Sequence, residues 1–518
     1  MLVFSGLEWR EESMDYPIWN LAMGGGLLMA LVAIPHVIVA HFAVGGGLVI
    51  AVTETLAVRR SDGALRELAR RSSLMLILVS TVFGAISGVG IWVVAGLISP
   101  GAISALIHTY VWGWAMEWVF FVIEIVSALV YYATWGKISK GAHLFVGWLY
   151  FVAAYLSLVI INGIITFMLT PGKWLESHSF WDGFFNPTYW PSLLLRTGIA
   201  ALMATAFMVF VALKTPEDRR AGVLRYLGWW LVGGALISYA GYRWWEASLP
   251  VSARALFLGP TPTLTGLADT RHLLLWALFA VLVLGVLILL LVPKLARGLT
   301  AVVLALAAFT FFGGYERLRE GSRKPFLINS HLFSNGLLVN DIESINHDGI
   351  AARSGWIARG DDDTVAVGRR IFKTECSSCH TIDGYQGIRQ ALPTVSEVMA
   401  VAADDPPGSA ERVFRTQCAA CHEDTTAAEM REVLPTPEEI RGDPEMIRDL
   451  NTGMIFATVA GLRAMGADYA AADAGRMIDT ASMDYPFMPP FVGTEDEAGD
   501  LVAYLATLTQ EQEKGGER

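Results

Sequence analysis

Long apolar runs separated by short polar loops fill the first three-fifths of the chain. A helix needs about 20 apolar residues to cross a bilayer, and eight runs of roughly that length occur. They lie near residues 25–52, 73–98, 110–134, 144–170, 191–213, 226–247, 272–293 and 298–316. The pattern predicts an all-α protein with an eight-helix transmembrane bundle in residues 1–325, a polar linker over 326–365 and an α-helical domain over 366–518.

Composition divides the chain at the same place. Hydrophobic residues make up 54% of the sequence and charged residues 17%, which is typical of a membrane protein surrounded by lipid. Residues 1–325 contain 23 basic and 17 acidic side chains, a net charge of +6, whereas residues 326–518 contain 15 basic and 32 acidic ones, a net charge of −17. The acidic part is expected to meet cationic proteins, and no nucleic-acid partner is expected.

Basic residues alternate between the loops of the predicted bundle. Five lie in the first loop, from Arg59 to Arg71, and the third loop repeats the excess with Lys137 and Lys140, whereas the loop over 99–107 has none. Basic loops remain in the cytoplasm, so the amino terminus is expected outside, and eight spans return the carboxyl-terminal domain to that side. The first 16 residues are acidic and lack an apolar core, so no cleavable signal peptide is predicted. The expected location is the cytoplasmic membrane of a bacterium.

All four cysteines lie in two Cys-x-x-Cys-His motifs. The first is Cys376, Cys379 and His380, and the second is Cys418, Cys421 and His422. The motif is typical of c-type haem attachment, in which the two thiols bond to the porphyrin and the histidine ligates the iron. A zinc site does not need the histidine, and a thioredoxin-like pair needs a βαβ setting, so both are weaker interpretations. Two covalent haem c groups are predicted. Their attachment outside the cytoplasmic membrane agrees with the loop charges.

The flanking segments resemble a class I cytochrome c. Residues 367–372 and 409–414 each resemble its short amino-terminal helix, while Met488 to Phe491 and the helical pattern over 495–508 resemble its methionine loop and final helix. Met488 is therefore a candidate sixth ligand for one haem. Since one closing segment serves two motifs, the haems are expected to share one compact body. Candidates for the other sixth ligand are Met399, Met430, Met454, Met465 or a histidine.

Ionisable residues inside the predicted spans are candidate functional groups, because they are costly in lipid. His36 and His41 lie five residues apart in the first span and so point in different directions. Glycine runs at 24–26 and 45–47 could let a flat ring approach this helix. Glu117 and Glu124 lie seven apart in the third span, which puts them on one helix face about 10 Å apart. They are expected to relay protons, to neighbour a haem propionate, or only to fasten helices together.

Five other polar positions are interpreted from their surroundings in the sequence. Arg196 and the Arg271-His272 pair start two spans, where arginines commonly mark the membrane interface. His331 and His347 lie in the predicted linker and are expected at the surface.

Residues 20–330 resemble subunit I of the cytochrome bd quinol oxidases. The run from His36 through Glu54 resembles the first haem-bearing helix of that family, with His36 at the high-spin haem ligand. Glu117 and Glu124 resemble its paired acids, although the family spacing is eight, and residues 143–163 resemble its fourth helix. The stretch 314–325 resembles its Gly-Arg-Gln-Pro-Trp region, which implies that Arg323 contacts a haem propionate. The resemblance implies one or more haem b, bound quinone and a second membrane subunit.

Three departures from the family accompany this resemblance. The histidine of the low-spin haem falls at about Arg196 and the opposite methionine near Arg271, so that haem is either lost or held differently, with His41 and His272 as remaining candidate ligands. A glutamate ligand appears replaced around Gly313. The family's large quinol loop is reduced to residues 247–270.

Three functions are compatible with these patterns. The first is a membrane b/c-type cytochrome, an oxidoreductase that transfers electrons between the quinone pool and an extracytoplasmic redox protein. The second is a bd-type quinol:oxygen oxidoreductase with an added dihaem domain. The third is a non-catalytic haem-bearing anchor subunit of a larger redox complex. The sequence does not give the direction of electron flow.

Overall fold

The computed structural model describes residues 19, 21–258, 262–352, 363–384, 387–392, 394–403, 414, 426–443, 445–472, 477–480, 483 and 485–515. Within these ranges, eight helical spans are long and apolar enough to cross a membrane, which confirms the predicted fold class. They are α1 (Gly25–Arg60), α2 (Gly63–Ile77) continued by the π-helical η1 (Leu78–Gly84) and α3 (Ala85–Ile98), α5 (Val111–Ala133), α6 (Lys140–Leu169), α9 (Tyr189–Ala212), α10 (Glu217–Ser248), α12 (Pro262–Leu284) continued by the π-helical η2 (Gly285–Leu291), and α13 (Gly298–Gly321).

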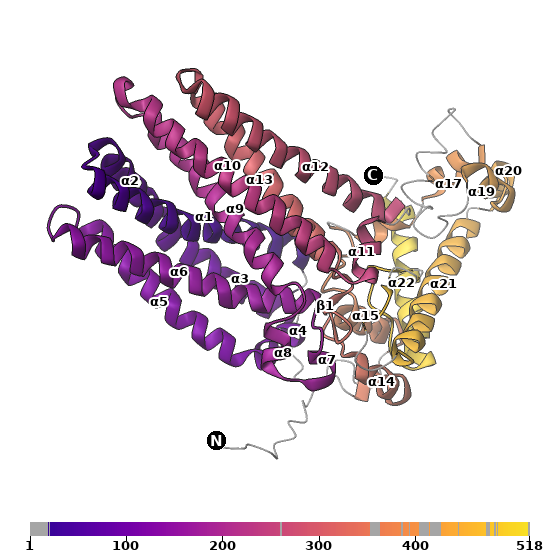
Figure 1. The fold of residues 1–518 in the computed structure, drawn as a ribbon. Coiled ribbons are helices and arrows are strands. Elements are labelled where there is room, and N and C mark those ends of the chain that lie inside the picture. The colour runs from indigo at the N-terminus through magenta and orange to yellow at the C-terminus, as the bar shows by residue number, and fades with distance from the viewer. Residues whose placement is uncertain are drawn as a thin grey trace, which may run out of the picture.

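Large apolar side chains cover the outside of this bundle. Ile86, Trp112 and Leu299 are 71%, 74% and 74% exposed, which only a lipid environment would favour for so many residues. Short helices join the spans: α4 (Pro100–Thr109), α7 (Trp174–Ser177), α8 (Phe180–Phe184), α11 (Val251–Leu258) and η3 (Pro293–Leu295). The basic loops after α1 and α5 lie at the end of the bundle away from the carboxyl-terminal body (Figure 1). We call this the far end and the opposite one the near end.

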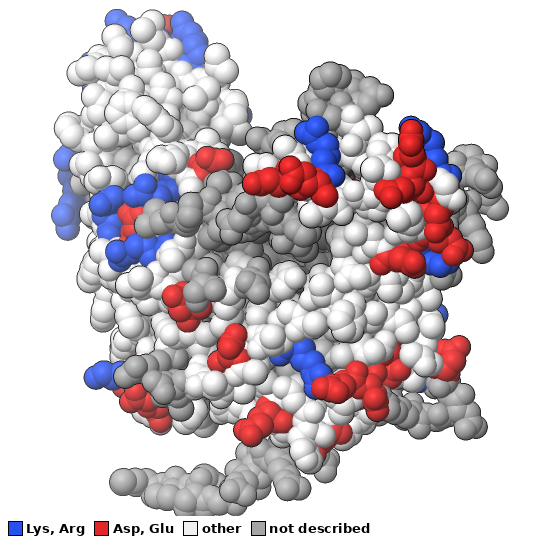
Figure 2. Space-filling view, turned by 90° about the vertical axis from the view of Figure 1, so that its right-hand side faces the viewer, with Lys and Arg blue, Asp and Glu red and all other residues white. Residues whose placement is uncertain are grey.

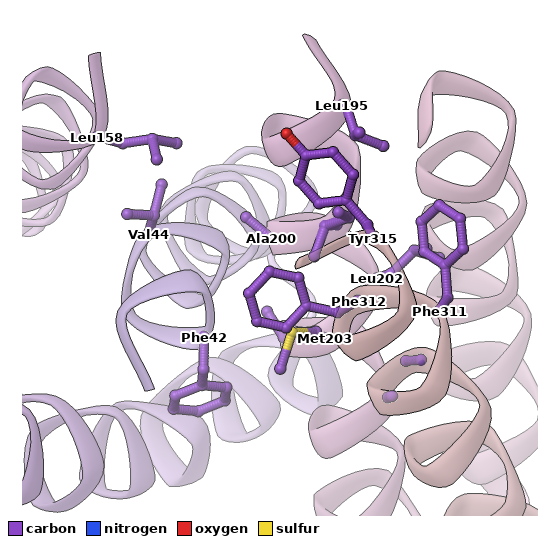
Figure 3. Packing of buried hydrophobic residues seen from close by; sticks show 14 of the residues in the cluster. Phe42, Val44, Leu158, Leu195, Ala200, Leu202, Met203, Phe311, Phe312 and Tyr315 are labelled. Carbon is purple, nitrogen blue, oxygen red and sulfur yellow. The ribbon is translucent and has the colours of Figure 1, made fainter. Parts of the chain in front are cut away.

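Small residues let the central helices approach closely. A Cβ at Gly45 would lie 1.9 Å from the Ala200 carbonyl oxygen, and one at Gly241 would lie 2.5 Å from the Leu195 nitrogen, so α9 packs backbone to backbone against both α1 and α10. Side chains from α1, α6, α9 and α13 fill the core around this crossing (Figure 3). Gly45 therefore approaches a neighbouring helix, whereas the sequence suggested room for a flat ring.

The carboxyl-terminal body is built mainly from helices. Its elements are β1 (Phe326–Ile328), β2 (Leu332–Phe333), η4 (Val339–Asp341), α14 (Ile342–Asp348), η5 (Ile350–Ala352), α15 (Thr364–Glu375), α16 (Ile388–Ala391), α17 (Val395–Ala403), α19 (Ala427–Val433), α20 (Pro437–Gly442), α21 (Glu445–Ala470) and α22 (Glu495–Gly515). Helices α15 and α22 cross at Gly368, where a Cβ would lie 1.9 Å from the Asp500 carbonyl oxygen. The predicted first and last helices of a cytochrome c-like unit thus pack together.

Three clusters of buried apolar side chains lie within the described part of this body. Ile371, Phe372 and Leu501 belong to the larger core beneath the first haem motif. Phe414 and Met430 belong to a small cluster with Ala427. Helix α21 contributes Ile455 to the larger core and Ile447 to a further small cluster, so it links the two regions.

The segment expected to be a linker is partly folded. Strands β1 and β2 form an antiparallel hairpin whose Phe326 and Phe333 rings stack 4.4 Å apart and are fully buried. The Asn329 amide donates to the Met168 carbonyl at 2.9 Å, and Ser99 Oγ donates to the Ser334 carbonyl at 3.1 Å. Residues 326–352 therefore join the near end of the bundle to the carboxyl-terminal body.

The two histidines of this segment have different surroundings. His347 is exposed, as predicted, with 87% of its side chain accessible. His331 is partly buried against the Trp174 ring at 4.9 Å, which corrects its predicted surface position. Burial, with a smaller repulsion from His178, lowers the pKa of His331 to about 4.

The His331 pKa predicts a pH-dependent contribution to stability. A depressed histidine pKa means that the folded state resists protonation, so stability is fully present above about pH 6.5 and is lost as the pH falls toward 4. The loss amounts to at most about 3 kcal/mol. Thermal unfolding in detergent between pH 7 and 4 should show a shallower acid loss for His331→Gln. The control His347→Gln should follow the wild type, and identical slopes for all three proteins would contradict the prediction.

Candidate functional site

The first haem motif continues directly from α15. Cys376 ends this helix, its amide donating to the Phe372 carbonyl, and the His380 amide donates to the Cys376 carbonyl at 2.9 Å. Cys376 and Cys379 are partly buried and are not joined in a disulfide. Burial, followed by repulsion from Glu375, raises the pKa of the Cys376 thiol. Covalent haem attachment needs two thiols that are not in a disulfide and a nearby histidine. The thiols of Cys376 and Cys379, with His380 beside them, meet this requirement.

The methionine loop lies on the core that supports this motif. The Met488 amide donates to the Tyr485 carbonyl at 3.1 Å, and Phe491 is buried in the same core as Phe372. The neighbouring Phe487 packs against the core of the bundle. The Met488 loop therefore lies at the junction between the two parts of the chain.

Cys418, Cys421 and His422 lie outside the described residues. Among the described residues, no three His, Cys, Asp or Glu side chains converge in a way that could hold a metal ion.

The ring of His36 is held by contacts to its Nδ1. Its Nδ1 lies 3.2 Å from the Gly84 carbonyl oxygen and 3.2 Å from Ser87 Oγ. A carbonyl can only accept, so Nδ1 carries the hydrogen and the lone pair lies on Nε2, the state in which imidazole binds a metal. The carbonyl belongs to the π-helical η1, a feature often found at functional sites.

His41 has its ring nitrogens occupied by protein groups. Its Nδ1 donates to the Val37 carbonyl at 2.8 Å, and its Nε2 accepts from Arg196 Nη1 at 3.2 Å. The lone pair that a haem iron would need is used by Arg196. This contact does not favour the predicted role of His41 as a haem ligand. His272, the other candidate, lies on the exposed face of α12, beside an Arg271 that pairs with Glu246 at 2.7 Å.

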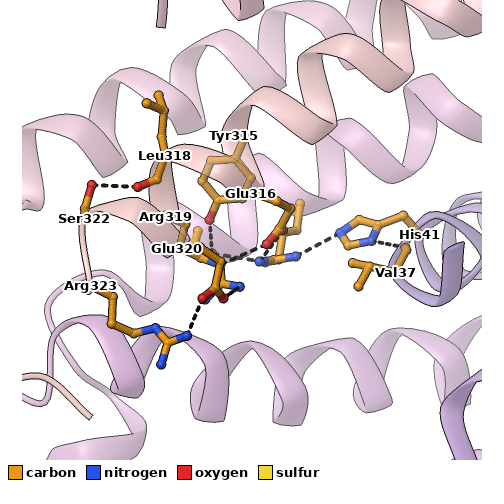
Figure 4. Close-up of polar contacts among 11 residues, drawn as sticks. Val37, His41, Tyr315, Glu316, Leu318, Arg319, Glu320, Ser322 and Arg323 are labelled. Atoms are coloured by element: carbon orange, nitrogen blue, oxygen red, sulfur yellow. Dashed lines mark hydrogen bonds and ion pairs between the residues drawn. The ribbon is translucent and has the colours of Figure 1, made fainter. Parts of the chain in front are cut away.

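A chain of paired charges runs from the buried His41 along α13 (Figure 4). Arg196 is 1% exposed, so it does not mark the interface, and it pairs with Glu316 at 2.7 Å. Glu316 in turn pairs with Arg319 at 2.9 Å, and Glu320 pairs with both Arg319 and Arg323. Each charge is compensated by the next, as the interior of a membrane protein requires.

This chain ends in donors that suit an anion. Arg323 Nη1 donates to the Leu327 carbonyl at 2.7 Å, while Arg323 Nε and Arg319 Nη1 are buried without a hydrogen-bond partner among the described residues. Buried guanidinium donors without partners are costly. They fit a carboxylate such as the predicted haem propionate.

The paired acids of the third span both face α6, as their spacing predicts. Ser157 Oγ donates to Glu117 at 3.1 Å, and the Tyr150 hydroxyl donates to Glu124 at 3.3 Å. Both carboxyl groups are partly buried. They lie on one continuous helix face with hydroxyl partners.

The sequence analysis missed a buried contact between an acid and a histidine. Glu54 lies 2.7 Å from His143 Nδ1 and accepts from the Tyr131 hydroxyl at 2.7 Å, and all three side chains are buried. The sequence does show an acid, Glu54, near the end of one predicted span and a histidine, His143, near the start of another. These two residues are 89 positions apart in the sequence, so no local pattern could indicate that they pair.

Residues 26–216 match the family model described as cytochrome bd terminal oxidase subunit I. The match spans α1 to the start of α10 and includes His36, Glu117, Glu124 and Arg196, so the predicted resemblance is confirmed for that part of the chain. A solved bd oxidase from Geobacillus thermodenitrificans shares 15% identity, with 58% of this chain and 87% of that chain covered at a TM-score of 0.48. No curated protein sequence matches the chain.

The buried Arg196–Glu316 pair predicts a large effect on stability. Arg196→Met leaves a buried carboxylate without one of its partners and should cost about 3–5 kcal/mol. Arg196→Met with Glu316→Leu removes both charges and should recover part of that loss. Thermal unfolding in detergent measures the series. Arg70→Met, in an exposed pair with Glu67, is the matched control and should cost less than about 1 kcal/mol. Equal effects of the two single variants would contradict this interpretation.

Proposed function

We propose that this protein is a quinone-linked membrane cytochrome. It would exchange electrons between membrane quinone and an extracytoplasmic redox protein through haem b in the bundle and two covalent haem c groups. The match of residues 26–216 to a quinol oxidase subunit supports the membrane part. The observation that carries the proposal is the placement of the first Cys-x-x-Cys-His motif in a body that packs directly on the near end of the bundle.

Three groups of residues would hold the cofactors. His36 would ligate haem b through Nε2, and the unpaired donors of Arg319 and Arg323 would bind its propionates. Cys376, Cys379 and His380 would hold the first haem c with Met488 as sixth ligand. The second motif would hold the other, with Met430 favoured as a ligand because it clusters with Phe414, which precedes that motif. The haem groups would supply one-electron transfer when bound.

The protein's own residues would manage protons and orientation. Glu117 and Glu124 accept hydrogen bonds from α6 hydroxyl groups and could each hold a proton released or consumed by quinone chemistry. Ser87 and the Gly84 carbonyl fix the ring of His36 in one tautomer.

The proposed location is the cytoplasmic membrane of a bacterium, with the carboxyl-terminal body outside. The basic loops at the far end support this orientation. Exposed acidic side chains gather over α19, α20 and the start of α21 in the carboxyl-terminal body. Figure 2 views the molecule from the side on which this body lies. They include Glu432, Glu438, Glu439, Asp443, Glu445 and Asp449. A cationic redox protein is the partner that such a surface would attract. We also propose a second membrane subunit, on the resemblance alone.

Terminal oxidase activity is the second candidate. The matching family is a terminal oxidase subunit, which favours it directly. The replacement of a ligand position by the ion-paired Arg196 argues for electron transfer without the family's complete haem set. A non-catalytic anchor subunit is the third candidate.

Haem counting tests the covalent sites. Pyridine haemochrome spectra of the purified protein should show two haem c per chain. Cys376→Ala with Cys379→Ala should leave one, and Cys418→Ala with Cys421→Ala should leave the other. An unchanged count in either double variant would refute the corresponding site, and a chain with haem c but no haem b would support the anchor role.

The bilayer ligand is tested by a pair of histidine variants. His36→Ala should lose haem b and lower quinol oxidation at least 100-fold, whereas His41→Gln should keep its haem b. Loss of haem b in His41→Gln alone would reverse the assignment. Quinol-dependent oxygen uptake, compared with reduction of a soluble cationic acceptor, decides between the oxidase and the electron-transfer roles.

A further inference from the structure

A small cavity lies at the far end of the bundle, where the start of α2 meets the loop between α9 and α10 (Figure 1). Its volume is about 300 Å³, which is at the lower end of the range, roughly 300–1,000 Å³, that is typical of small-molecule sites. Its walls come from the first turns of α2, the end of α9 and the first turn of α10. We call it the far-end cavity.

Two arginines from different helices line the far-end cavity. Arg71 belongs to α2, and Arg219 belongs to the first turn of α10. The Arg219 side chain reaches across to α2, since a Cβ at Gly63 would lie 3.6 Å from Arg219 Nη1. Asp218 lies 3.5 Å from Arg219 Nε and offsets part of its charge. The side chains of Arg71 and Arg219 are 44% and 61% exposed, so a ligand can reach both guanidinium groups.

Basic residues outnumber acidic ones around the far-end cavity. The carboxylate of Glu67, which lines it, accepts hydrogen bonds from Arg70 at 2.8 Å and from Arg71 at 2.6 Å. One acidic group is therefore shared between two guanidinium groups. Residues 59–71 and 214–220, which surround the cavity, together contain eight basic and four acidic residues. The cavity therefore favours an anionic ligand over a cationic one.

The far-end cavity continues into a lipid-facing strip of α2 and η1. Side chains spaced by three or four residues lie on one face of a helix. The face that borders the cavity carries Glu67 and Arg71, followed by Leu74 and Leu78. The two leucines are 42% and 56% exposed on the outside of the bundle. The buried Leu68 adds an apolar group inside the cavity. A ligand with an anionic head and an apolar tail would match both parts.

We propose that the far-end cavity binds the phosphate-bearing headgroup of an anionic phospholipid. The guanidinium groups of Arg71 and Arg219 would donate hydrogen bonds to the phosphate oxygens. An acyl chain would lie along Leu74 and Leu78 in the bilayer. Since the two arginines come from different helices, the bound lipid would fasten the start of α10 to α2. This site does not depend on the proposed electron transfer.

Membrane orientation alone accounts for less of this arrangement. Basic residues in a loop are enough to hold that loop in the cytoplasm. Orientation does not require arginines from two separate loops to border one cavity. It also does not require that cavity to continue into an exposed apolar strip on the same helix face.

Lipid binding to the purified full-length protein tests the proposal. Native mass spectrometry in detergent, with phosphatidylglycerol added, gives the affinity of the tightest bound lipid. Arg71→Gln with Arg219→Gln should weaken this binding at least about tenfold, because each basic residue near an anionic headgroup contributes several-fold. Arg59→Gln with Arg66→Gln removes the same charge at positions that do not line the cavity. This control should change the affinity less than about twofold, because salt screens exposed charges at a distance.

A second variant separates the shape of the cavity from its charge. Ala64 is half-buried and lines the cavity, so Ala64→Trp would fill it without removing an arginine. This variant should weaken binding as strongly as the arginine pair does. Thermal unfolding in detergent checks that each variant is folded. Equal affinities of the wild type, the arginine pair and Ala64→Trp would overturn the site.

The choice of lipid decides the chemistry of the ligand. Phosphatidylcholine has an acyl tail but no net charge, and inorganic phosphate has the charge but no tail. Phosphatidylglycerol should bind more tightly than either. Equal affinity for phosphatidylcholine would overturn the preference for an anion. Displacement of phosphatidylglycerol by inorganic phosphate at the same concentration would overturn the lipid as the source of the phosphate group.

Discussion

The ion pair between Arg196 and Glu316 is the constraint on which the centre of the bundle depends. Lipid cannot solvate either charge, so each must stay within reach of the other. The pair links α9 to α13, and Arg196 extends the link to α1 by donating to His41. The close backbone crossing of α1 and α9 at Gly45 brings these groups together. Sliding α9 or α13 by one turn would leave a charge unpaired, and sliding α1 would leave an Arg196 donor without its acceptor.

Two of the polar networks in the described bundle have different chemical capacities. The network on α13 is held by guanidinium groups, which do not give up a proton at any physiological pH. It can hold an anion and set a local potential, but it is unsuited to carrying protons. The network between α5 and α6 contains no arginine, and its hydroxyl, imidazole and carboxyl groups can all exchange protons.

Features repeated along the chain could be predicted from the sequence. The eight spans follow from apolar length, and the shared face of Glu117 and Glu124 follows from helical periodicity. Pairings between distant segments could not be predicted. The partner of His41 lies 155 positions away on α9, so the sequence leaves His41 as a plausible ligand.

Short elements were missed for a related reason. The hairpin of β1 and β2 has strands of three and two residues, too short for an alternating pattern to appear. Its surroundings are polar, and residues 326–365 therefore suggested a linker. Two buried phenylalanines, Phe326 and Phe333, supply the packing that holds this segment in place.

That hairpin fixes the carboxyl-terminal body on the membrane surface. A tethered domain samples many positions and meets its target at a frequency set by the length of its tether. Here the Asn329 and Ser99 hydrogen bonds and the buried phenylalanine pair leave little such freedom. Under the proposed function, electrons would cross this junction over a separation set by these contacts, and the diffusional search would be that of the proposed partner.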